Sequence, residues 1–465
     1  MNLQGRNVAV VGLGQSGRAA AALCLERGAK VWGYDEQATE DPGLVGLKAR
    51  GLSLSLGVLP DDLSGHEVVV VSPGVPRKPQ FDAADAAGRE VIGEMELASR
   101  FVERPIVLVG GTNGKSTVTA WVGEMMRAGG REPFVGGNFG TPLSVYVSAL
   151  AKPTPARAGA EVLVLEISSF QAERVPTLRA RCHTLLNISE DHLDRYASFR
   201  DYADAKGNPF VNMTEEDFAV IPSGDARVAR QAGRGQAQVV TFGLDKGDVC
   251  IEDDELVDHR TGHRYPVSSL KLPGLHNLNN ACAAVATASV MGLRSEAIAH
   301  ALADFIGLPH RSSVVATMGG VRFYDDSKAT NVGAAVAALR GLPEERAVLI
   351  AGGRDKHGSY APLVEALRLK GRAMVVIGEA AERLAEAAEG ALPIVRAASM
   401  VDAVARAASL ARVGDAVLLS PACSSFDMFQ SYKARGDAFV AAVRELAGDR
   451  TMPSGHGGPD TGRSM

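Results

Sequence analysis

Short apolar runs alternate with longer amphipathic stretches along almost the whole chain. The short runs predict buried strands, and apolar positions that recur every three or four residues predict helices. Strands that alternate with helices indicate parallel sheets with right-handed crossovers, which place ligand sites at the carboxyl ends of the strands. The pattern therefore predicts an α/β fold.

Strands and helices are predicted at definite places along the chain. The predicted strands are Asn7–Val11, Lys30–Tyr34, Val68–Val71, Ile106–Val109, Val162–Ile167, Thr184–Ile188, Ala219–Pro222, Arg322–Tyr324, Ala347–Ala351, Ala373–Ile377 and Ala416–Leu419. The predicted helices are Ser16–Arg27, Glu94–Val102, Lys115–Ala128, Asn277–Met291, Val332–Ala338 and Ser399–Leu410.

The alternation falls into three blocks, which we interpret as three domains. Residues 1–93 are expected to form a Rossmann-like domain, and residues 94–306 a central domain with a mainly parallel sheet. Residues 307–449 are expected to form a second Rossmann-like domain. The tail, residues 450–465, is rich in Gly, Pro and Ser and is predicted to be disordered.

Composition narrows the class of protein. Of the 465 residues, 46% are hydrophobic and 22% charged, as expected of a packed globular chain. The net charge of −5 gives no electrostatic reason to expect nucleic acid as a partner. No two of the five cysteines have C-x-x-C spacing, so neither a zinc site nor a disulfide framework is predicted. With no leader and no run of roughly 18 apolar residues, we expect a cytoplasmic protein without membrane insertion.

The clearest motif is the segment Gly110–Thr117, with the sequence GGTNGKST, which follows an apolar strand and opens an amphipathic helix. Glycines allow backbone N–H groups to approach phosphate oxygens, and the lysine reaches the outer phosphates. The hydroxyl of Ser116 is suited to bind Mg²⁺. A Gly-rich turn with a merely solvated lysine is the alternative, and the strand before and helix after make it the weaker one.

A second glycine motif, Gly12–Gly17 (GLGQSG), follows the first predicted strand, and Asp35 lies 18 residues beyond Gly17. This is the pattern of a dinucleotide fingerprint, in which a phosphate-bearing ligand sits on a helix N-terminus. The motif alone does not specify nicotinamide, and a structural tight turn stays open. Ser72 lies in a further loop on the same predicted sheet edge.

Three polar side chains near strand ends are candidates for chemistry. Glu166 follows an apolar run, where a carboxylate needs a cation or a polar site, and with Ser116 it would suit a hard cation. His192 lies in the polar segment Asn187–Arg195, where a solvated loop histidine is an equal alternative. For Lys206 the spacing does not distinguish a functional lysine from a surface one.

The C-terminal half contains three more strands that end in polar loops. These loops are Tyr324–Asn331, Gly352–Lys356 and Leu418–Asp427. Each alone is typical of an ordinary turn, but together they predict a shared cleft for an anionic substrate. Before them, Asn277 is a candidate helix cap and Asn280 a candidate for hydrogen bonding to a base.

Taken together, the motifs resemble the Mur ligase family of peptidoglycan precursor synthesis over roughly residues 5–446. The segments that carry the resemblance are, in order, GTNGKST, LEISSFQ, NISEDHLDRY, GLHNLNN, PHR, DDSKATN, GGRDK and LSPACSSFDMF. The SSFQ and SPACSSFDMF segments favour the D-glutamate-adding branch over those that add alanine, diaminopimelate or a dipeptide. Another amino-acid-adding branch or a folylpolyglutamate synthase-like ligase is the alternative.

The resemblance implies a fold as well as a reaction. The central block, residues 94–306, would be a P-loop-type ATPase domain. ATP would phosphorylate the carboxylate of UDP-N-acetylmuramoyl-L-alanine, and the amine of D-glutamate would displace the phosphate. ATP and two Mg²⁺ ions are the implied cofactors, the two small-molecule substrates are the implied partners, and a monomer is expected.

The resemblance also implies residue roles. Catalytic roles fall to Lys115, His192, Lys206 and Lys356. One Mg²⁺ would be held by Ser116 and Glu166, and the other by His192 and a carbamylated Lys206. The ATP site would comprise Gly111, Thr112, Asn113, Gly114, Lys115, Ser116, Thr117, Asn280, Arg311 and Asp326. The UDP-substrate site would comprise Gly14, Ser16, Asp35, Ser72, Asn138 and Ser168. The D-glutamate site would comprise Thr330, Lys356, Ser425, Phe426 and Tyr432.

Other classes of function explain fewer of the motifs. A nucleotide-dependent oxidoreductase would explain Gly12–Gly17 but would leave Lys115 and Glu166 without a role. A folylpolyglutamate synthase relative shares the central and C-terminal features but usually lacks a first domain of this kind. A non-catalytic binding protein would have no need of the intact lysine and acid set.

Overall fold

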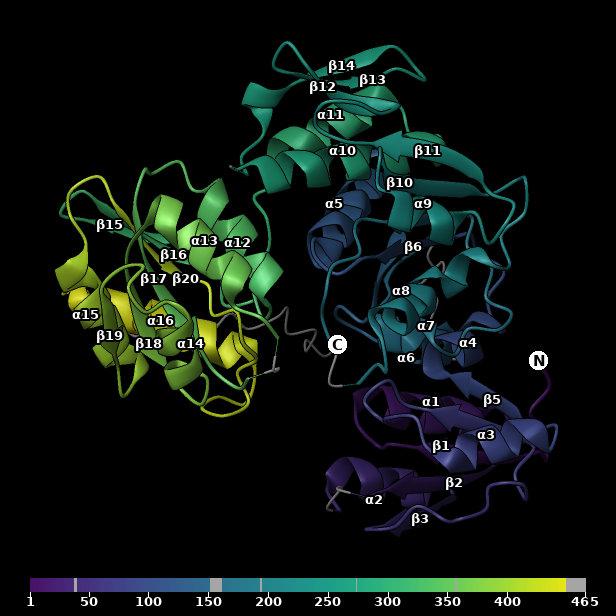
Figure 1. Cartoon of the computed structure of the whole chain (residues 1–465). Coiled ribbons are helices and arrows are strands. Elements are labelled where there is room, and N and C mark those ends of the chain that lie inside the picture. Colours follow the sequence, from purple (N-terminus) through teal and green to yellow (C-terminus); the bar gives the residue numbers. More distant parts are fainter. Residues whose placement is uncertain (37–39, 151–160, 193–194, 273, 356–357, 449–465) are drawn as a thin grey trace, which may run out of the picture. The chain divides into compact units, whose positions relative to one another are not determined.

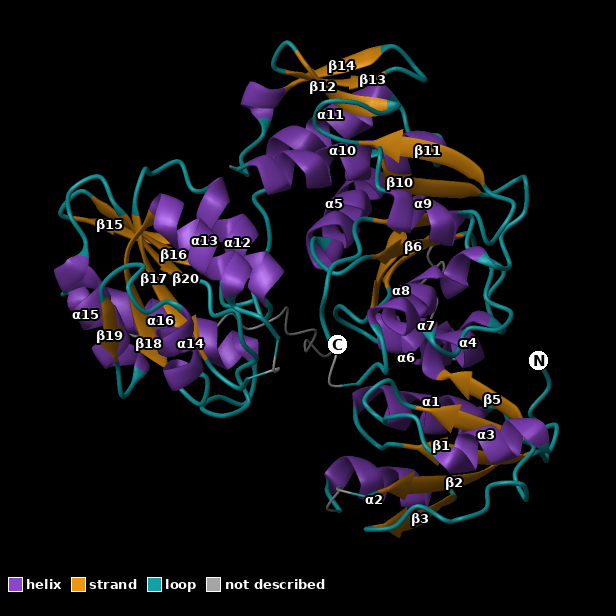
Figure 2. Ribbon diagram, viewed as in Figure 1, coloured by secondary structure: helices purple, strands orange, loops and turns teal. Residues whose placement is uncertain are grey.

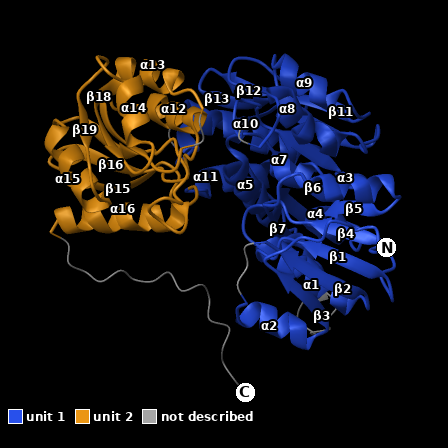
Figure 3. Cartoon of the chain, turned by 60° about the horizontal axis from the view of Figure 1, so that its bottom comes forward, with its two compact units in different colours: residues 1–306 blue, residues 307–465 orange. Residues whose placement is uncertain are grey.

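The structure is a computed structural model that describes residues 1–36, 40–150, 161–192, 195–272, 274–355 and 358–448 (Figure 1). The chain divides into two compact units (Figure 3). Unit 1, Met1–Ile306, contains two sheets, and unit 2, Gly307–Met465, contains the third. Helices accompany each sheet (Figure 2), and most strand pairs are parallel, so the predicted α/β class is confirmed. The predicted tail lies outside the described residues.

The first sheet of unit 1 has five parallel strands. Its order is β3 (Leu52–Leu56), β2 (Lys30–Asp35), β1 (Asn7–Val11), β4 (Val68–Val71) and β5 (Glu90–Gly93). Its helices are α1 (Gln15–Glu26), α2 (Pro42–Ala49), α3 (Pro79–Ala86) and α4 (Glu94–Ser99). This strand order is Rossmann-like, with the glycine motif between β1 and α1.

The second sheet of unit 1 has nine strands. Its order is β14 (His263–Pro266), β13 (Glu255–Asp258), β12 (Val249–Glu252), β11 (Gln238–Phe242), β10 (Phe218–Pro222), β9 (Cys182–Leu185), β6 (Ile106–Gly110), β8 (Val162–Glu166) and β7 (Pro133–Gly137). The pairs from β7 to β12 are parallel, whereas β12, β13 and β14 form an antiparallel meander.

The remaining helices of unit 1 belong to this second sheet. They are α5 (Lys115–Ala128), α6 (Leu143–Leu150), α7 (Ser169–Ala172), α8 (Phe199–Gly207), α9 (Ala226–Ala232), α10 (Leu275–Val290) and α11 (Ser295–Asp304), with 3-10 turns at Asn208–Phe210 and Val267–Ser269. Helix α8 ends at Gly207, and the chain continues through Asn208, whose backbone angles are still helical, into the 3-10 turn Asn208–Phe210.

The sheet of unit 2 has six strands. Its order is β15 (Ser313–Met318), β16 (Val321–Asp325), β20 (Ala416–Leu419), β17 (Ala347–Gly352), β18 (Gly371–Ile377) and β19 (Ile394–Arg396). The β15–β16 pair is antiparallel and the other pairs are parallel. The helices are α12 (Val332–Gly341), α13 (Ala361–Lys370), α14 (Ala381–Ala387), α15 (Met400–Leu410) and α16 (Tyr432–Leu446).

The sheets are buried on both faces, as continuous apolar strands predict. In β1, Val8 and Val10 join one core cluster, while Ala9 and Val11 join the cluster on the opposite face. In β6, Leu108 and Val109 likewise belong to different clusters. These buried central strands fix the positions at which their carboxyl-end loops emerge.

Some predicted boundaries are wrong in detail. The strand predicted at Thr184–Ile188 is β9, which ends at Leu185, although Leu186 and Ile188 are also buried. Their apolar character reflects packing beneath a loop rather than strand pairing. Asn277 is not the helix cap, since α10 begins at Leu275 with Gly274 in the cap position. Among the described residues, no helix combines the length and apolar character needed to cross a membrane.

Candidate active site

The glycine-rich loop Gly110–Thr117 joins the buried strand β6 to helix α5. Gly111 and Gly114 adopt positive φ angles of 136° and 87°, which favour glycine. Gly114 occupies the cap position of α5 without a side-chain cap, and helix N-termini of this kind bind anions through backbone amides. A Cβ atom on Gly114 would lie 2.5 Å from Oδ1 of Asn280, so the glycine permits α10 to approach the loop.

The loop is held in shape by side chains from the strand end and helix next to it. Oδ1 of Asn187 accepts hydrogen bonds from the backbone N–H groups of Thr112 and Asn113, at 3.1 and 2.9 Å. The hydroxyl of Thr112 lies 2.9 Å from the hydroxyl of Tyr202 and donates to the carbonyl of Ser189. Several bonds therefore fix one loop conformation before any ligand binds.

A buried carboxylate lies beside the loop. Glu166, at the end of β8, is 2% exposed. Its Oε2 accepts a hydrogen bond from Ser116 Oγ at 2.5 Å, and its Oε1 accepts one from Asn138 Nδ2 at 2.6 Å. The sequence-predicted pair Ser116 and Glu166 is thus in direct contact. Its donor atoms are all oxygen, which is the donor set that Mg²⁺ prefers.

Two lysines share one carbonyl of the loop. Nζ of Lys115 donates to the carbonyls of Gly111 and Thr112, at 2.9 and 2.8 Å, and Nζ of the buried Lys206 donates to the Gly111 carbonyl at 2.7 Å. Burial, and then the positive charge of Lys115, hold the pKa of Lys206 well below its usual value, while Asp191 acts in the opposite direction. Lys206 therefore carries a neutral amine over a wider pH range than a surface lysine.

His192 follows β9 in a strained backbone conformation, with a φ of 55°. Its Nε2 lies 3.6 Å from Oδ2 of Asp191, and its ring lies 4.7 Å, centroid to centroid, from the ring of Phe170 on α7. The guanidinium of Arg195 covers the same Phe170 ring at 4.1 Å. The histidine is therefore oriented by an acid and an aromatic ring rather than simply solvated.

A pocket of about 430 Å³ lies between the first sheet and the loops after β7 and β8. Its volume falls in the usual range of small-molecule sites. Five of the six residues predicted for the UDP-substrate site line it: Gly14, Ser16, Asp35, Ser72 and Asn138. The sixth, Ser168, caps α7 in a capping box with Gln171, which lines the pocket.

The glycine motif of this pocket is tightly packed. Oδ2 of Asp35 accepts a hydrogen bond from the backbone N–H of Leu13 at 2.6 Å, and Ser72 Oγ donates to the Gly12 carbonyl at 2.6 Å. A Cβ atom on Gly17 would lie 1.8 Å from the Gly12 carbonyl oxygen, so only glycine fits there. These contacts fix a ligand-binding loop at the carboxyl edge of the sheet.

In unit 2, the three polar loops predicted to share a cleft do lie together. Strands β16, β20 and β17 are adjacent and parallel, so their carboxyl ends meet at one edge. Arg435, from α16 and 2% exposed, joins the loops that follow them. It donates to Ser327 Oγ and O, to the carbonyls of Cys423 and Ser424, and more weakly to that of Gly352.

The residues predicted for D-glutamate lie on or beside these loops. The Lys328 ammonium sits 3.9 Å from the ring centroid of Tyr432, and the Thr330 N–H bonds to the Lys328 carbonyl. Ser425 is buried, whereas Phe426 is 66% exposed. Lys356 lies outside the described residues.

Asp326, predicted for ATP, lies buried at the end of β16. Its carboxylate accepts hydrogen bonds from the Ser312 N–H at 3.1 Å and from Ser420 Oγ at 2.9 Å. Burial raises the pKa of Asp326 to about 7, although these bonds and the charge of Arg311 act in the opposite direction. The side chain is therefore half protonated near neutral pH.

This raised pKa predicts a pH-dependent stability. Between about pH 4 and pH 7 folded Asp326 keeps a proton that the unfolded chain loses, so the unfolding free energy falls by roughly 4 kcal/mol as pH rises. In Asp326→Asn the amide oxygen can still accept from the Ser312 N–H, and the amide N–H can donate to Ser420 Oγ. Because an amide does not titrate, this variant should lack the fall. Urea unfolding of wild type and variant at pH 5 and pH 8 measures it, with the exposed Glu389→Gln as control. An equal pH dependence in wild type and Asp326→Asn would contradict the prediction.

Sequence reasoning missed several residues that shape the site. Asn187 and Asp191 lie in the segment NISEDHLDRY, which assigned them no role, and Tyr202 and Arg435 were not singled out. A strand-end asparagine after a buried strand could have pointed to Asn187. No local pattern marks Arg435, because an arginine in an amphipathic helix usually faces solvent.

Comparisons with known proteins agree with this geometry. Family models match residues 6–93 as the Mur ligase MurD-like N-terminal domain, 109–288 as the Mur ligase middle domain and 310–423 as the Mur ligase glutamate ligase domain. The three predicted domain types are thereby confirmed as Mur ligase domains.

Relatives match over nearly the full length. The UDP-N-acetylmuramoylalanine–D-glutamate ligases of Geobacter metallireducens and Geotalea daltonii are each 42% identical to the chain, covering 96% of it and 99% of their own lengths. The crystal structure of MurF ligase from Thermotoga maritima in complex with ADP covers 97% of the chain and 96% of its own, with a TM-score of 0.61 and 17% identity. At that identity the structural likeness concerns the fold alone.

Proposed function

The chain belongs to the Mur ligase family, and we propose which of its residues carry out each part of its activity. That activity is the ATP-dependent addition of D-glutamate to UDP-N-acetylmuramoyl-L-alanine in peptidoglycan precursor synthesis. The observation that carries this choice of activity is the near-full-length identity to D-glutamate ligases. The intact phosphate loop with its buried acid and lysines supports it independently.

The reaction has two transfers. A carboxylate oxygen of UDP-N-acetylmuramoyl-L-alanine attacks the γ-phosphorus of ATP, ADP leaves, and an acyl phosphate forms. The amine nitrogen of D-glutamate then attacks the acyl carbon, loses a proton, and expels inorganic phosphate to leave an amide. Both steps gather negative charge, so the protein contributes mainly positioning and charge neutralisation.

Lys115 is assigned to the transferring phosphate. It opens α5 beside the loop amides, and its ammonium already lies among the loop carbonyls of Gly111 and Thr112. A phosphate there would offer the ammonium a full negative charge in place of those neutral carbonyls. Residues Gly111–Thr117 would hold the β- and γ-phosphates, and Asn280, which lies against Gly114, would contact the nucleotide.

The oxygen donors of Ser116 and Glu166 fit a magnesium ion, because a buried carboxylate and a hydroxyl in contact form a hard-cation donor set. Magnesium at this position would neutralise charge on the phosphates. Asn138 orients the carboxylate through its second oxygen. A second ion would be held by His192 and a modified Lys206.

Lys206 is proposed to be carbamylated. Its neutral amine can attack CO₂, forming an N–C bond and releasing one proton, and this converts the amine into an anionic carbamate. Burial favours the neutral amine that this step needs, and Lys115 nearby would stabilise the resulting anion. Tyr202, whose ring lies 4.7 Å from Nζ, would restrict the side chain to this position.

The remaining assignments follow the sites already described. The pocket of about 430 Å³ is assigned to the UDP-muramoyl substrate, through Gly14, Ser16, Asp35, Ser72 and Asn138, with Ser168 at its border. The loops of unit 2 are assigned to D-glutamate, through Thr330, Lys356, Ser425, Phe426 and Tyr432. Arg311 and Asp326 are assigned to ATP.

Further features stay predictions. We assign the UDP-substrate domain to residues 1–93, the ATP-binding domain to residues 94–306 and the amino-acid-binding domain to residues 307–449. The division of the chain into two compact units after Ile306 supports the second of these boundaries. The monomeric state and the cytoplasmic location are proposed with them.

The test of the function is phosphate release by the purified chain with ATP, Mg²⁺, UDP-N-acetylmuramoyl-L-alanine and D-glutamate. We expect release to require all four, with the D-glutamyl product seen by mass spectrometry. L-glutamate and L-alanine serve as matched amino-acid controls. Release with another amino acid but not with D-glutamate would overturn the proposed specificity.

A further inference from the structure

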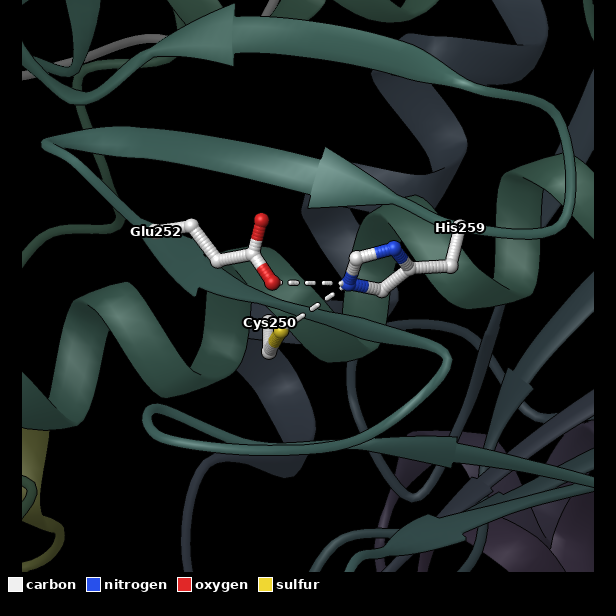
Figure 4. A group of neighbouring side chains, drawn as sticks. All are labelled: Cys250, Glu252 and His259. Carbon is white, nitrogen blue, oxygen red and sulfur yellow. Dashed lines mark hydrogen bonds and ion pairs between the residues drawn. The ribbon is translucent and has the colours of Figure 1, made fainter.

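The antiparallel meander β12–β13–β14 carries a group of side chains that the ligase reaction does not use. Cys250 and Glu252 lie on β12, and His259 follows β13 directly (Figure 4). Their three ligand atoms lie within 4.8 Å of one another. In the part of the chain that the structure describes, no other group of three histidine, cysteine or acidic side chains meets this criterion.

The strand register makes Cys250 and His259 neighbours and places Glu252 on the same face. Cys250 and Glu252 are two residues apart on one strand, so they point to the same face. Cys250 pairs with Val257, which makes His259 its diagonal neighbour on that face. The turn between the strands uses Asp253 and Asp254 with φ angles of 49° and 60°, the signature of a tight two-residue hairpin that fixes this register.

The distances fit a tetrahedral metal. His259 Nε2 lies 3.5 Å from Cys250 Sγ and 3.1 Å from Glu252 Oε1 (Figure 4). Zinc bonds of about 2.3 Å to sulfur and about 2.1 Å to nitrogen or oxygen, at a tetrahedral angle, separate such atoms by about 3.6 Å and about 3.4 Å. The imidazole nitrogen therefore faces both other donors at nearly the separation that a shared ion requires.

The surroundings also suit a metal. The second oxygen of Glu252 lies 3.3 Å from Arg264 Nη2, which leaves the first oxygen directed at His259, as carboxylate ligands are commonly oriented. Cys250 is buried, whereas the side chains of Glu252 and His259 are 40% and 46% exposed. One side of the group is thus open to an ion and to a water as fourth ligand.

The donor set selects the class of ion. A thiolate and an imidazole favour zinc-like transition metals, whereas Mg²⁺ prefers oxygen alone. A thiolate and a carboxylate would also balance the two charges of a divalent ion. Strand β12 is four strands away from β6, which feeds the phosphate loop, or about 19 Å at ordinary strand spacing. The group therefore cannot contribute ligands to the magnesium site.

We propose that Cys250, Glu252 and His259 form a binding site for one zinc-class divalent ion, separate from the ligase active site, which ties β12 to the end of β13.

The test uses the full-length protein, freed of metal, and Co²⁺ as a spectroscopic probe. We expect one equivalent of Co²⁺ to produce thiolate-to-cobalt charge-transfer absorption with the visible bands of a tetrahedral site, and Zn²⁺ to displace it. Cys250→Ser should abolish the charge-transfer band. Glu252→Gln and His259→Gln should weaken Co²⁺ binding at least about tenfold.

His263→Gln is the matched control, because His263 is an exposed histidine on β14 of the same meander. It should bind Co²⁺ like the wild type. Thermal unfolding of each variant without metal shows whether weaker Co²⁺ binding comes from the missing metal-binding side chain or from a disrupted fold. If Cys250→Ser is unstable, the variants at the half-exposed Glu252 and His259 still test the proposal. Absence of the band in the wild type, or an unchanged titration in any of the three ligand variants, would overturn the proposal.

Discussion

Replacing Lys115 by methionine is expected to lower the maximal rate of phosphate release by at least about 10³-fold while the chain stays folded. The ammonium of Lys115 lies within hydrogen-bonding distance of two loop carbonyls, at the N-terminus of α5. Methionine has similar length but brings no charge to the phosphoryl group as negative charge redistributes in the transition state. The rate should therefore fall much more than the affinity for ATP.

Lys48→Met provides the matched control for Lys115→Met. Lys48 is a surface lysine of α2 that pairs with Glu40 at 2.6 Å, and its loss should leave the rate unchanged. Phosphate release, ATP binding and the thermal unfolding midpoint are measured for both variants. A fall of less than tenfold in Lys115→Met, with ATP still bound, would remove Lys115 from the phosphoryl-transfer step.

Lys206→Ala is expected to lose at least about 100-fold of the activity and to regain part of it when formate or acetate is added. A short carboxylate can occupy the space left by the side chain and replace the anion of the proposed carbamate. The space is defined by the Gly111 carbonyl, 2.7 Å from Nζ, and by the ring of Tyr202. Chemical rescue of this kind distinguishes a missing anion from a missing lysine cation.

Two further variants sharpen the test of Lys206. Lys206→Arg introduces a permanent positive charge and cannot form a carbamate, so it should be inactive. The exposed Lys246→Ala should behave like the wild type. The measurement is phosphate release over a range of carboxylate concentrations. Full activity of unsupplemented Lys206→Ala, or retained activity in Lys206→Arg, would exclude the carbamate.

Much of the fold could be predicted because its central strands are continuous apolar runs. The strands predicted at Asn7–Val11, Val68–Val71 and Ala416–Leu419 match β1, β4 and β20 to the residue. Other strands were missed, among them β13 and β14 of the meander and β3 at a sheet edge. Strands β13 and β14 have four residues each, too few for a periodic pattern to show. The alternating sequence LSLSL of β3 is a strand signal that the prediction overlooked.

The candidate site was predicted in part for the same reason. The contact between Ser116 and Glu166 follows from two strand ends on one edge of a parallel sheet. A strand-end position marks Asn187 as a candidate, but its contact with the amides of Thr112 and Asn113 could not be predicted. It depends on β9 lying next to β6, and strand neighbours in a crossover sheet are distant in sequence.

The sequence by itself determined the α/β class, the phosphate loop and the family, because these depend on local periodicity and on motifs a few residues long. Only the tertiary structure decided which polar groups meet: Lys206 with the Gly111 carbonyl, Arg435 with three loops, and Cys250 with His259. Such meetings depend on strand order and register, which follow from the packing of the whole chain. Burial then changes the chemistry of the groups, as the lowered pKa of Lys206 and the raised pKa of Asp326 show.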